Sequence, residues 1–216
     1  MRVLVFGDSI TQGYWAIEHG WVDLLRKHYD EIQVQNPGTE QPSVFNLGVS
    51  ADTSRDLLNR VESEVAARSR EHHTMKPVLI VQIGVNDSSE RGSNRDLAVS
   101  QDQYEENLND LVSRMQPSVS QIVFVGLSAC DEQKVLPVSW GEFYYSNQNI
   151  REYEEIMQRV ATEREIPFVA IFDEFTCASK SDKSLLHDGL HPTDSGHQLI
   201  YDIVKEQIDS VLQEVA

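Results

Sequence analysis

At about 150 residues per domain, the 216 residues of this chain predict a single domain over residues 1–216. The chain has 18 Lys and Arg against 35 Asp and Glu, a formal net charge of −17, which argues against binding to nucleic acid or to an anionic membrane. Two cysteines indicate no disulfide framework, and the first apolar run, residues 1–6, is too short for a signal peptide. No apolar run is as long as a membrane span, so we expect a cytoplasmic protein.

Short apolar runs alternate with longer amphipathic segments from one end of the chain to the other. Strand–helix alternation of this kind predicts a parallel sheet covered by helices on both faces. In chain order we predict a strand at 2–6, a helix at 15–28, strands at 32–35 and 44–47, a helix at 53–70, a strand at 78–83, a helix at 101–115, a strand at 121–127, a helix at 147–164, a strand at 168–172 and a helix at 192–215.

Functional sites of parallel sheets lie beyond the carboxyl ends of the strands, so we expect the catalytic residues in the loops there. Ser9 lies two residues beyond the first strand, between Gly7 and Gly13. This position can present a serine nucleophile, because glycine lets the chain turn without a Cβ clash. Ser9 could equally be a helix N-cap. A phosphate-binding loop is disfavoured because no Lys-Ser or Lys-Thr pair follows.

Asp188 and His191 lie three residues apart, just before the last predicted helix. A serine nucleophile needs a base, and the base needs an orienting carboxylate, which a short turn could supply here. The alternatives are an ordinary surface turn and a metal site at His187 and His191. Gly189 and Pro192 make a shared helical face for the two histidines improbable, so we predict no metal.

Two further loops could stabilise an oxyanion. Asn86 follows the strand at 78–83, and its side chain could donate a hydrogen bond; an Asx turn is the simpler alternative. Gly48 follows the strand at 44–47, and its backbone N–H could donate to the same oxyanion, unless this segment is a plain strand–helix linker.

Taken together, four sequence blocks resemble the SGNH hydrolases, also called GDSL lipases and esterases. The blocks are Gly7-Asp8-Ser9-Ile10-Thr11, Asn46-Leu47-Gly48, Gly84-Val85-Asn86-Asp87 and Asp188-Gly189-Leu190-His191-Pro192, in that order. The resemblance implies a flavodoxin-like three-layer α/β/α fold whose five-stranded parallel sheet has the order 2-1-3-4-5.

The same resemblance implies roles for individual residues. Ser9 would be the nucleophile, His191 the base and Asp188 its orienting carboxylate. The backbone N–H groups of Ser9 and Gly48 and the side chain of Asn86 would form the oxyanion hole. No cofactor is implied, and the expected reaction is hydrolysis of a carboxylic ester through an acyl-enzyme. A non-catalytic flavodoxin-like binding module is the alternative from a different class.

Substrate specificity is expected to reside in the loop at 127–146, which is long for a strand–helix connection. Its aromatic residues could wall a pocket or simply pack the loop onto the body. We expect a small, water-soluble ester with a short acyl group as the substrate; lysophospholipase, thioesterase and carbohydrate O-deacetylase activities are alternatives within the family. The candidate substrate-binding residues are Trp15, Trp140, Phe143, Tyr144 and Tyr145.

Overall fold

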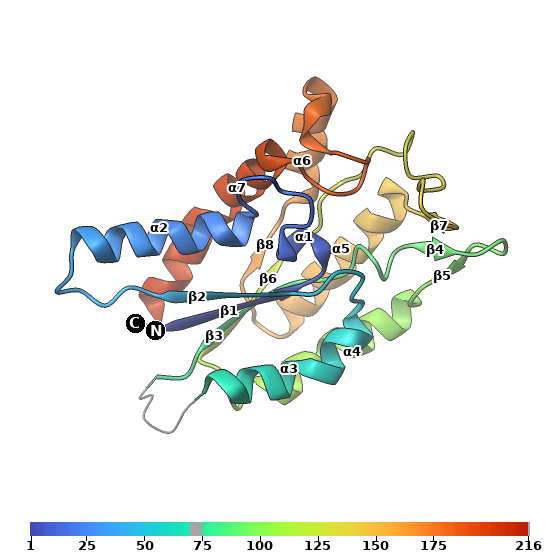
Figure 1. The fold of residues 1–216 in the computed structure, drawn as a ribbon. Helices are drawn as coiled ribbons and strands as arrows, with labels where there is room; N and C mark the ends of the chain where they lie inside the picture. The colour runs from blue at the N-terminus through green and yellow to red at the C-terminus, as the bar shows by residue number, and fades with distance from the viewer. Residues whose placement is uncertain (70–74, 216) are drawn as a thin grey trace.

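The computed structural model describes residues 1–69 and 75–215 and has three layers, helices above and below a central sheet (Figure 1). The sheet order is β2-β1-β3-β6-β8, and every neighbouring pair is parallel. Counted along the chain, these five strands have the predicted order 2-1-3-4-5. The strands are β1 (Arg2–Gly7), β2 (Ser43–Gly48), β3 (Val78–Gln82), β6 (Gln121–Val125) and β8 (Phe168–Val169).

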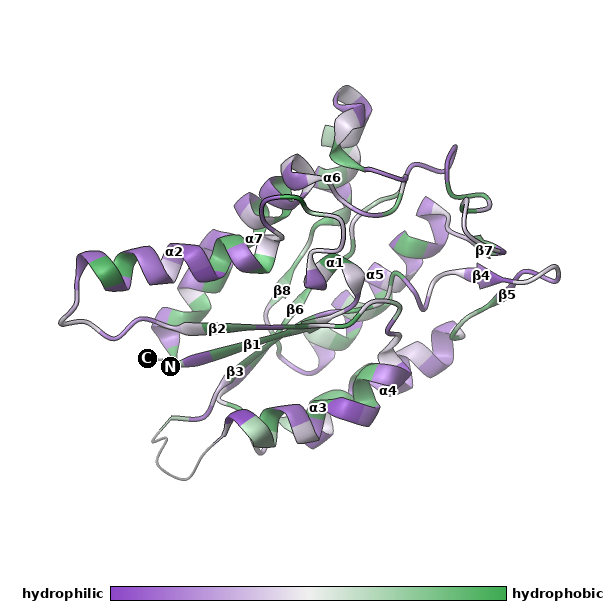
Figure 2. Ribbon diagram, in the orientation of Figure 1, coloured by the Kyte–Doolittle hydropathy of each residue, from purple (hydrophilic) through white to green (hydrophobic). Residues whose placement is uncertain are grey.

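Long helices cover both faces of the sheet (Figure 1). The helices α2 and α7 pack together on one face, and α3, α4 and α5 pack side by side on the other. Because both faces are covered, the strands are apolar along their length while the outer helix surfaces are polar (Figure 2). The helices are α2 (Trp21–Gln35), α3 (Ser54–Arg68), α4 (Gln101–Met115), α5 (Asn147–Glu163) and α7 (Asp194–Glu214).

Hydroxyl side chains fix where four of these helices begin. Thr53, Ser100, Ser146 and Thr193 each accept a hydrogen bond from a backbone N–H in the first turn of the helix that follows. Such caps satisfy N–H groups that have no partner within the helix. The predicted boundaries of these helices therefore lie within about two residues of the observed ones, except that predicted helix residue 70 lies outside the described residues.

The segment 15–35 differs from the prediction. Trp15 has a left-handed backbone with φ of 67°, which no helix interior accommodates, and α2 begins only after Gly20. The helix also ends later than predicted. It includes residues 32–35, which we predicted as a strand. Their apolar–polar alternation does not reflect a sheet face, because Val34 is 80% exposed.

Several elements near the carboxyl ends of the strands were not predicted. The short helix α1 (Ser9–Gln12) follows β1, and α6 (Phe172–Ser181) with the 3₁₀ turn η1 (Lys183–Leu185) follows β8. A second sheet of order β5-β4-β7 joins β4 (Glu90–Arg91), β5 (Asp96–Leu97) and β7 (Phe143–Tyr144). Its β4–β7 pairing fastens the loop at 127–146 to the segment after β3. Over the described residues, no helix combines the length and apolarity that a membrane span needs.

Candidate active site

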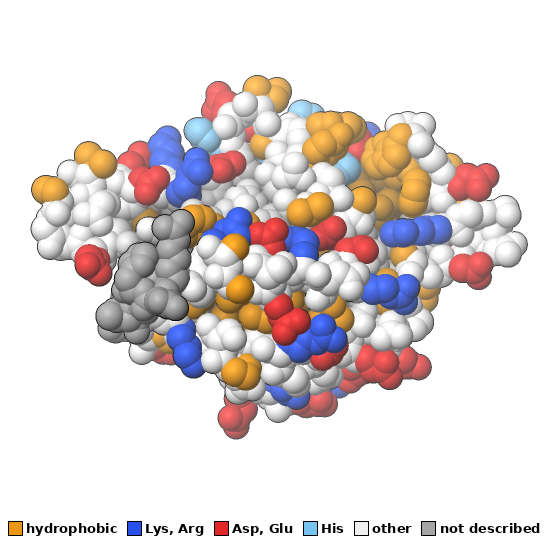
Figure 3. Space-filling view, turned by 60° about the horizontal axis from the view of Figure 1, so that its bottom comes forward, with side chains coloured by type: hydrophobic (Ala, Val, Ile, Leu, Met, Phe, Trp, Pro, Cys, Tyr) orange, Lys and Arg blue, Asp and Glu red, His pale blue; other side chains and the backbone are white. Residues whose placement is uncertain are grey.

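A pocket of about 660 Å³ lies at the carboxyl ends of β1 and β3, and Ser9, Asn86 and His191 all line it. These residues come from three separate loops, which the parallel sheet brings to one edge. In the space-filling view, hydrophobic side chains gather beside histidine side chains at one end of the molecule (Figure 3).

Ser9 is the first residue of α1, and the close approach of this short helix to the sheet sets its position. A Cβ on Gly7 would lie 2.0 Å from Thr11 Oγ1 and 2.3 Å from the Gln82 carbonyl oxygen, so only glycine fits there. The preceding Asp8 caps α1 by accepting a hydrogen bond from Ile10 N at 2.9 Å. Burial raises the pKa of Asp8 to about 7.

His191 joins the Ser9 hydroxyl to the Asp188 carboxylate. Its Nε2 lies 3.0 Å from Ser9 Oγ, and its Nδ1 lies 2.8 Å from Asp188 Oδ2. Both ring nitrogens thus have partners within the protein. A neutral His191 with its proton on Nδ1 could accept the proton of the serine hydroxyl through Nε2.

The turn from Asp188 to His191 folds the carboxylate back onto the imidazole, as the spacing predicts. Asp188 Oδ1 accepts hydrogen bonds from the backbone N–H groups of Leu190 at 2.9 Å and His191 at 2.8 Å, while Gly189 adopts a positive φ of 96°. Burial alone would raise the pKa of Asp188, but the hydrogen bonds from the His191 ring and the backbone outweigh it and lower that pKa. Asp188 therefore stays a carboxylate at neutral pH.

Asn86 reaches the pocket from the loop after β3, and the start of α3 holds it there. Its Nδ2 donates to the Asp52 carbonyl oxygen at 3.0 Å. The adjacent Asp87 accepts from Ser54 N at 3.0 Å, so the loop is fastened to the first turn of α3. Burial raises the pKa of Asp87 to about 6, although the bonds from Ser54 oppose this rise.

The structure does not bring the Gly48 N–H into the pocket, which corrects the sequence prediction. That N–H donates to Asn46 Oδ1 at 3.0 Å, and Gly48 is not among the pocket-lining residues. The glycine is required for a different reason: a Cβ there would lie 2.2 Å from Gln12 N, where β2 passes close to α1. Gly48 is thus a packing residue between two elements.

Ala51, three residues further along, lines the pocket instead. Its φ of 69° is left-handed, a conformation uncommon for residues with a Cβ. Gln12 Oε1 holds the turn by accepting from both Ser50 N and Ser50 Oγ. Across residues 1–69 and 75–215, the Ala51 N–H has no protein acceptor. Sequence reasoning missed this residue, because alanine is not a residue type that favours a positive φ.

Four of the five predicted pocket residues line the cavity: Trp15, Trp140, Phe143 and Tyr145. Trp15 and Trp140 are 45% and 48% exposed, and their ring centroids lie 6.2 Å apart. Tyr144 does not line it; the Arg95 guanidinium stacks on its ring at 4.5 Å. The correction follows from strand geometry, because successive side chains of β7 point to opposite sides.

Gln82, the polar interruption in the otherwise apolar strand β3, was not recognised as part of the site's support. Its Oε1 accepts from Thr11 Oγ1 at 3.1 Å and from the Trp21 indole at 3.0 Å, and its Nε2 donates to the Gly126 carbonyl. A buried amide linking α1, α2 and β6 holds the Ser9 helix on the sheet. The polar residue inside a buried run was the signal that could have revealed it.

Comparison with known proteins places this constellation in a family. Residues 5–199 match the model of the GDSL-like Lipase/Acylhydrolase family. The chain belongs to that family. It is 23% identical to the isoamyl acetate-hydrolyzing esterase of Saccharomyces cerevisiae over 97% of this chain and 86% of that protein. It is 25% identical to the acetylxylan esterase of Geobacillus stearothermophilus over 92% of this chain and 90% of that protein.

Solved structures agree with this assignment at the level of fold. The lipase/acylhydrolase of Enterococcus faecalis superposes with a TM-score of 0.73 at 24% identity, covering 97% of this chain and 95% of that one. The Geobacillus stearothermophilus acetylxylan esterase superposes with a TM-score of 0.69 at 24% identity, covering 95% and 93%. As a GDSL-family esterase, the protein is a carboxylic ester hydrolase.

Proposed function

We propose that Ser9, His191 and Asp188 are the catalytic triad of this esterase, acting on short-chain esters of small, water-soluble alcohols. The observation that carries the proposal is the position of the His191 ring, hydrogen-bonded to Ser9 Oγ on one side and to the Asp188 carboxylate on the other. This is the arrangement that a serine nucleophile requires for activation.

The reaction proceeds in two steps. Ser9 Oγ attacks the ester carbonyl carbon while His191 Nε2 takes the hydroxyl proton, which gives a tetrahedral oxyanion. Collapse of this intermediate breaks the bond to the alcohol oxygen, and His191 delivers the proton to the leaving alkoxide. A water molecule, deprotonated by the same imidazole, then attacks the acyl-enzyme and releases the acid. Asp188 keeps the Nδ1 proton in place throughout.

We assign the oxyanion hole to the backbone N–H groups of Ser9 and Ala51 and to the Nδ2 of Asn86. Ala51 replaces Gly48 in this assignment, because the Gly48 N–H is already bonded to Asn46. Ala51 and Asn86 both line the pocket beside Ser9. Donors that are fixed before the substrate arrives stabilise the developing charge without reorganisation.

Two features support a short acyl group. The pocket of about 660 Å³ is lined by short loops at the strand ends together with Ser139, Trp140, Phe143 and Tyr145 from the loop at 127–146, so little chain is available to build a deep acyl tunnel. The two related esterases are named for acetyl esters, isoamyl acetate and acetylxylan. Acetyl to butyryl groups are therefore the acyl groups we expect.

Acetylated carbohydrate is a second candidate substrate. The half-exposed indoles of Trp15 and Trp140 flank His191, with centroids 5.2 and 5.9 Å from its ring. Aromatic faces of this kind offer flat apolar surfaces to the C–H faces of a sugar ring. Acetate release from acetylated xylo-oligosaccharides faster than from isoamyl acetate would favour this candidate.

The proposal is tested with a series of p-nitrophenyl esters from acetate to dodecanoate, together with fluorophosphonate labelling. We expect labelling at Ser9, highest kcat/KM for acetate to butyrate, and no increase when the substrate passes its solubility limit. A rate that climbs beyond ten carbons, or that rises on an emulsion, would instead identify a lipase or lysophospholipase. Labelling at a serine other than Ser9 would refute the assignment of the nucleophile.

Replacing Trp140 tests the wall of the pocket. Trp140→Ala enlarges the cavity and keeps the hydrogen-bonding groups of Ser9, His191 and Asp188, so we expect a shifted chain-length preference or a KM raised several-fold. Reaction with p-nitrophenyl acetate should change less, because this small activated ester needs little of the wall. Leu97→Ala, a change of an exposed apolar residue in β5 away from the pocket, is the control.

A further inference from the structure

The amide of Asn86 can function as an oxyanion donor only in one of its two orientations. Its Nδ2 lies 3.0 Å from the Asp52 carbonyl oxygen, which accepts hydrogen bonds and cannot donate them. The nitrogen must therefore face Asp52, and a 180° flip would set two oxygen atoms against each other. With one Nδ2 hydrogen bonded to Asp52, the second is left for the pocket.

The other end of the same amide meets Tyr145. The Tyr145 hydroxyl donates to Asn86 Oδ1 at 3.1 Å. Both residues are buried, since Tyr145 is 5% exposed and Asn86 is 7% exposed. Burial raises the pKa of Tyr145 to about 12, so the phenol keeps its proton near neutral pH and remains a donor. Asn86 is thus held between an acceptor at its nitrogen and a donor at its oxygen.

From this geometry we infer that Tyr145 is a positioning residue for the oxyanion hole, which orients and polarises the Asn86 amide. The inference rests on the proposed esterase mechanism and deepens it. A hydrogen bond to an amide oxygen draws electron density from the nitrogen, which makes the remaining N–H a stronger donor toward a negative charge. Tyr145 itself touches neither Ser9 nor His191 through a hydrogen bond among the described residues.

Because Tyr145 belongs to the loop at 127–146, this loop has a second role beside lining the pocket. The Tyr145 backbone N–H donates to the Val135 carbonyl at 3.0 Å, and Asn149 Nδ2 donates to the Ser88 carbonyl at 3.2 Å. The first bond lies within the loop, and the second fastens the start of α5 to the segment that carries Asn86. The β4–β7 pairing fastens the loop itself to the same segment after β3. The same loop supplies Trp140 to the pocket wall, so substrate contact and support of the oxyanion donor reside in one segment.

The experiment is a double-mutant cycle between Tyr145→Phe and Asn86→Ala, assayed with p-nitrophenyl acetate. Tyr145→Phe removes one oxygen atom and keeps the ring, and we expect kcat to fall about 5- to 10-fold, the loss of one buried hydrogen bond, with KM nearly unchanged. In the Asn86→Ala background the same change should have no further effect on kcat, because the group that Tyr145 orients is gone.

Tyr153→Phe is the matched control, since the Tyr153 hydroxyl is also buried and donates to the Val99 carbonyl, away from the pocket. It should lower the thermal midpoint and leave kcat unchanged.

The inference is overturned if Tyr145→Phe keeps wild-type kcat, or if its kcat loss persists in full without Asn86. Failure of the underlying mechanism looks different: wild-type protein would then show no fluorophosphonate labelling of Ser9. If Tyr145→Phe does not fold, the NMR order parameter of the Asn86 side-chain amide in the wild type decides, and an amide as mobile as that of an exposed asparagine overturns the inference.

Discussion

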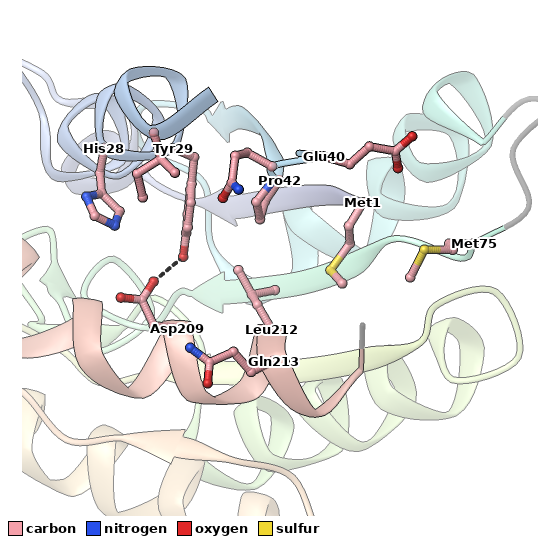
Figure 4. A pocket seen from close by; sticks show the side chains of 11 residues that line it. Met1, His28, Tyr29, Glu40, Pro42, Met75, Asp209, Leu212 and Gln213 are labelled. Atoms are coloured by element: carbon pink, nitrogen blue, oxygen red, sulfur yellow. Dashed lines mark hydrogen bonds between the residues drawn. The ribbon is translucent and has the colours of Figure 1, made fainter. Parts of the chain in front are cut away.

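The two ends of the central sheet carry cavities of comparable size and different chemistry. At the carboxyl ends of the strands, about 660 Å³ is lined by Ser9, Asn86 and His191. At the other end, beside the start of β1, about 430 Å³ lies between α2 and α7 (Figure 4). Size alone therefore does not distinguish a site of reaction from a gap between packed elements.

The difference lies in what the polar groups of each cavity do. In the second cavity the Tyr29 hydroxyl donates to Asp209 Oδ1 at 2.5 Å (Figure 4). Lys205, outside the lining of this cavity, pairs with the other oxygen of this carboxylate at 2.9 Å. These groups satisfy one another and tie α2 to α7. In the first cavity, the Ala51 N–H and one hydrogen of Asn86 have no acceptor within residues 1–69 and 75–215. Unused donors directed at one space are what a developing oxyanion requires.

The largest expected effect tests whether the first cavity is the site of reaction, by removing the proposed nucleophile. Ser9→Ala should lower kcat by about 10⁴- to 10⁶-fold, because the covalent route disappears. The thermal midpoint should stay within a few degrees, since Asp8 still caps α1 and Gly7 still packs against Thr11. Ser63→Ala, on the exposed surface of α3, is the control and should keep wild-type activity. Substantial ester hydrolysis by purified Ser9→Ala would mean that the reaction takes place elsewhere in the molecule.

A smaller effect is expected from the oxyanion donor. Asn86→Ala should lower kcat by about 10²- to 10³-fold, the usual cost of one such donor. KM should change little, because the donor acts mainly in the transition state. Asn109→Ala, in the middle of α4, offers the same truncation away from the pocket. A defect of Asn86→Ala that lies wholly in KM would mean that this amide binds substrate.

The smallest effect is predicted at the opposite end of the sheet. Tyr29→Phe removes the bond to Asp209 between α2 and α7, so we expect a loss of about 1 kcal/mol in the free energy of unfolding. Steady-state kinetics should match wild type. Urea denaturation beside an ester assay gives both values, and a drop in kcat/KM would show that this end of the molecule influences the reaction.

The alternation of strands and helices and the positions of Ser9, Asn86, Asp188 and His191 could be predicted because they depend on local signals, whereas the order of the strands was expected only from the resemblance to the SGNH hydrolases. Apolar runs mark buried strands, and polar residues directly after them mark one edge of a parallel sheet. Asp188 and His191 are only three positions apart, so the turn that joins them can be predicted from the local sequence. Their catalytic roles remain predictions.

What could not be predicted depends on contacts between distant segments or on unusual backbone conformations. Gly48 was taken for a donor because it ends a strand, whereas its need for glycine comes from Gln12, 36 positions away. Ala51 and Trp15 adopt left-handed conformations that their residue types do not favour. The pairing of two-residue strands that places Tyr145 leaves no periodic pattern to detect.

The hydrogen bond between Ser9 and His191 joins residues separated by 182 positions. During synthesis on the ribosome, Ser9 is therefore made 182 residues before His191. While the intervening chain is translated, the serine hydroxyl has no base beside it, and the pair assembles only when β8, the turn from Asp188 to His191 and helix α7 have docked. The separation of the two residues along the chain delays the proposed chemistry until the sheet is assembled.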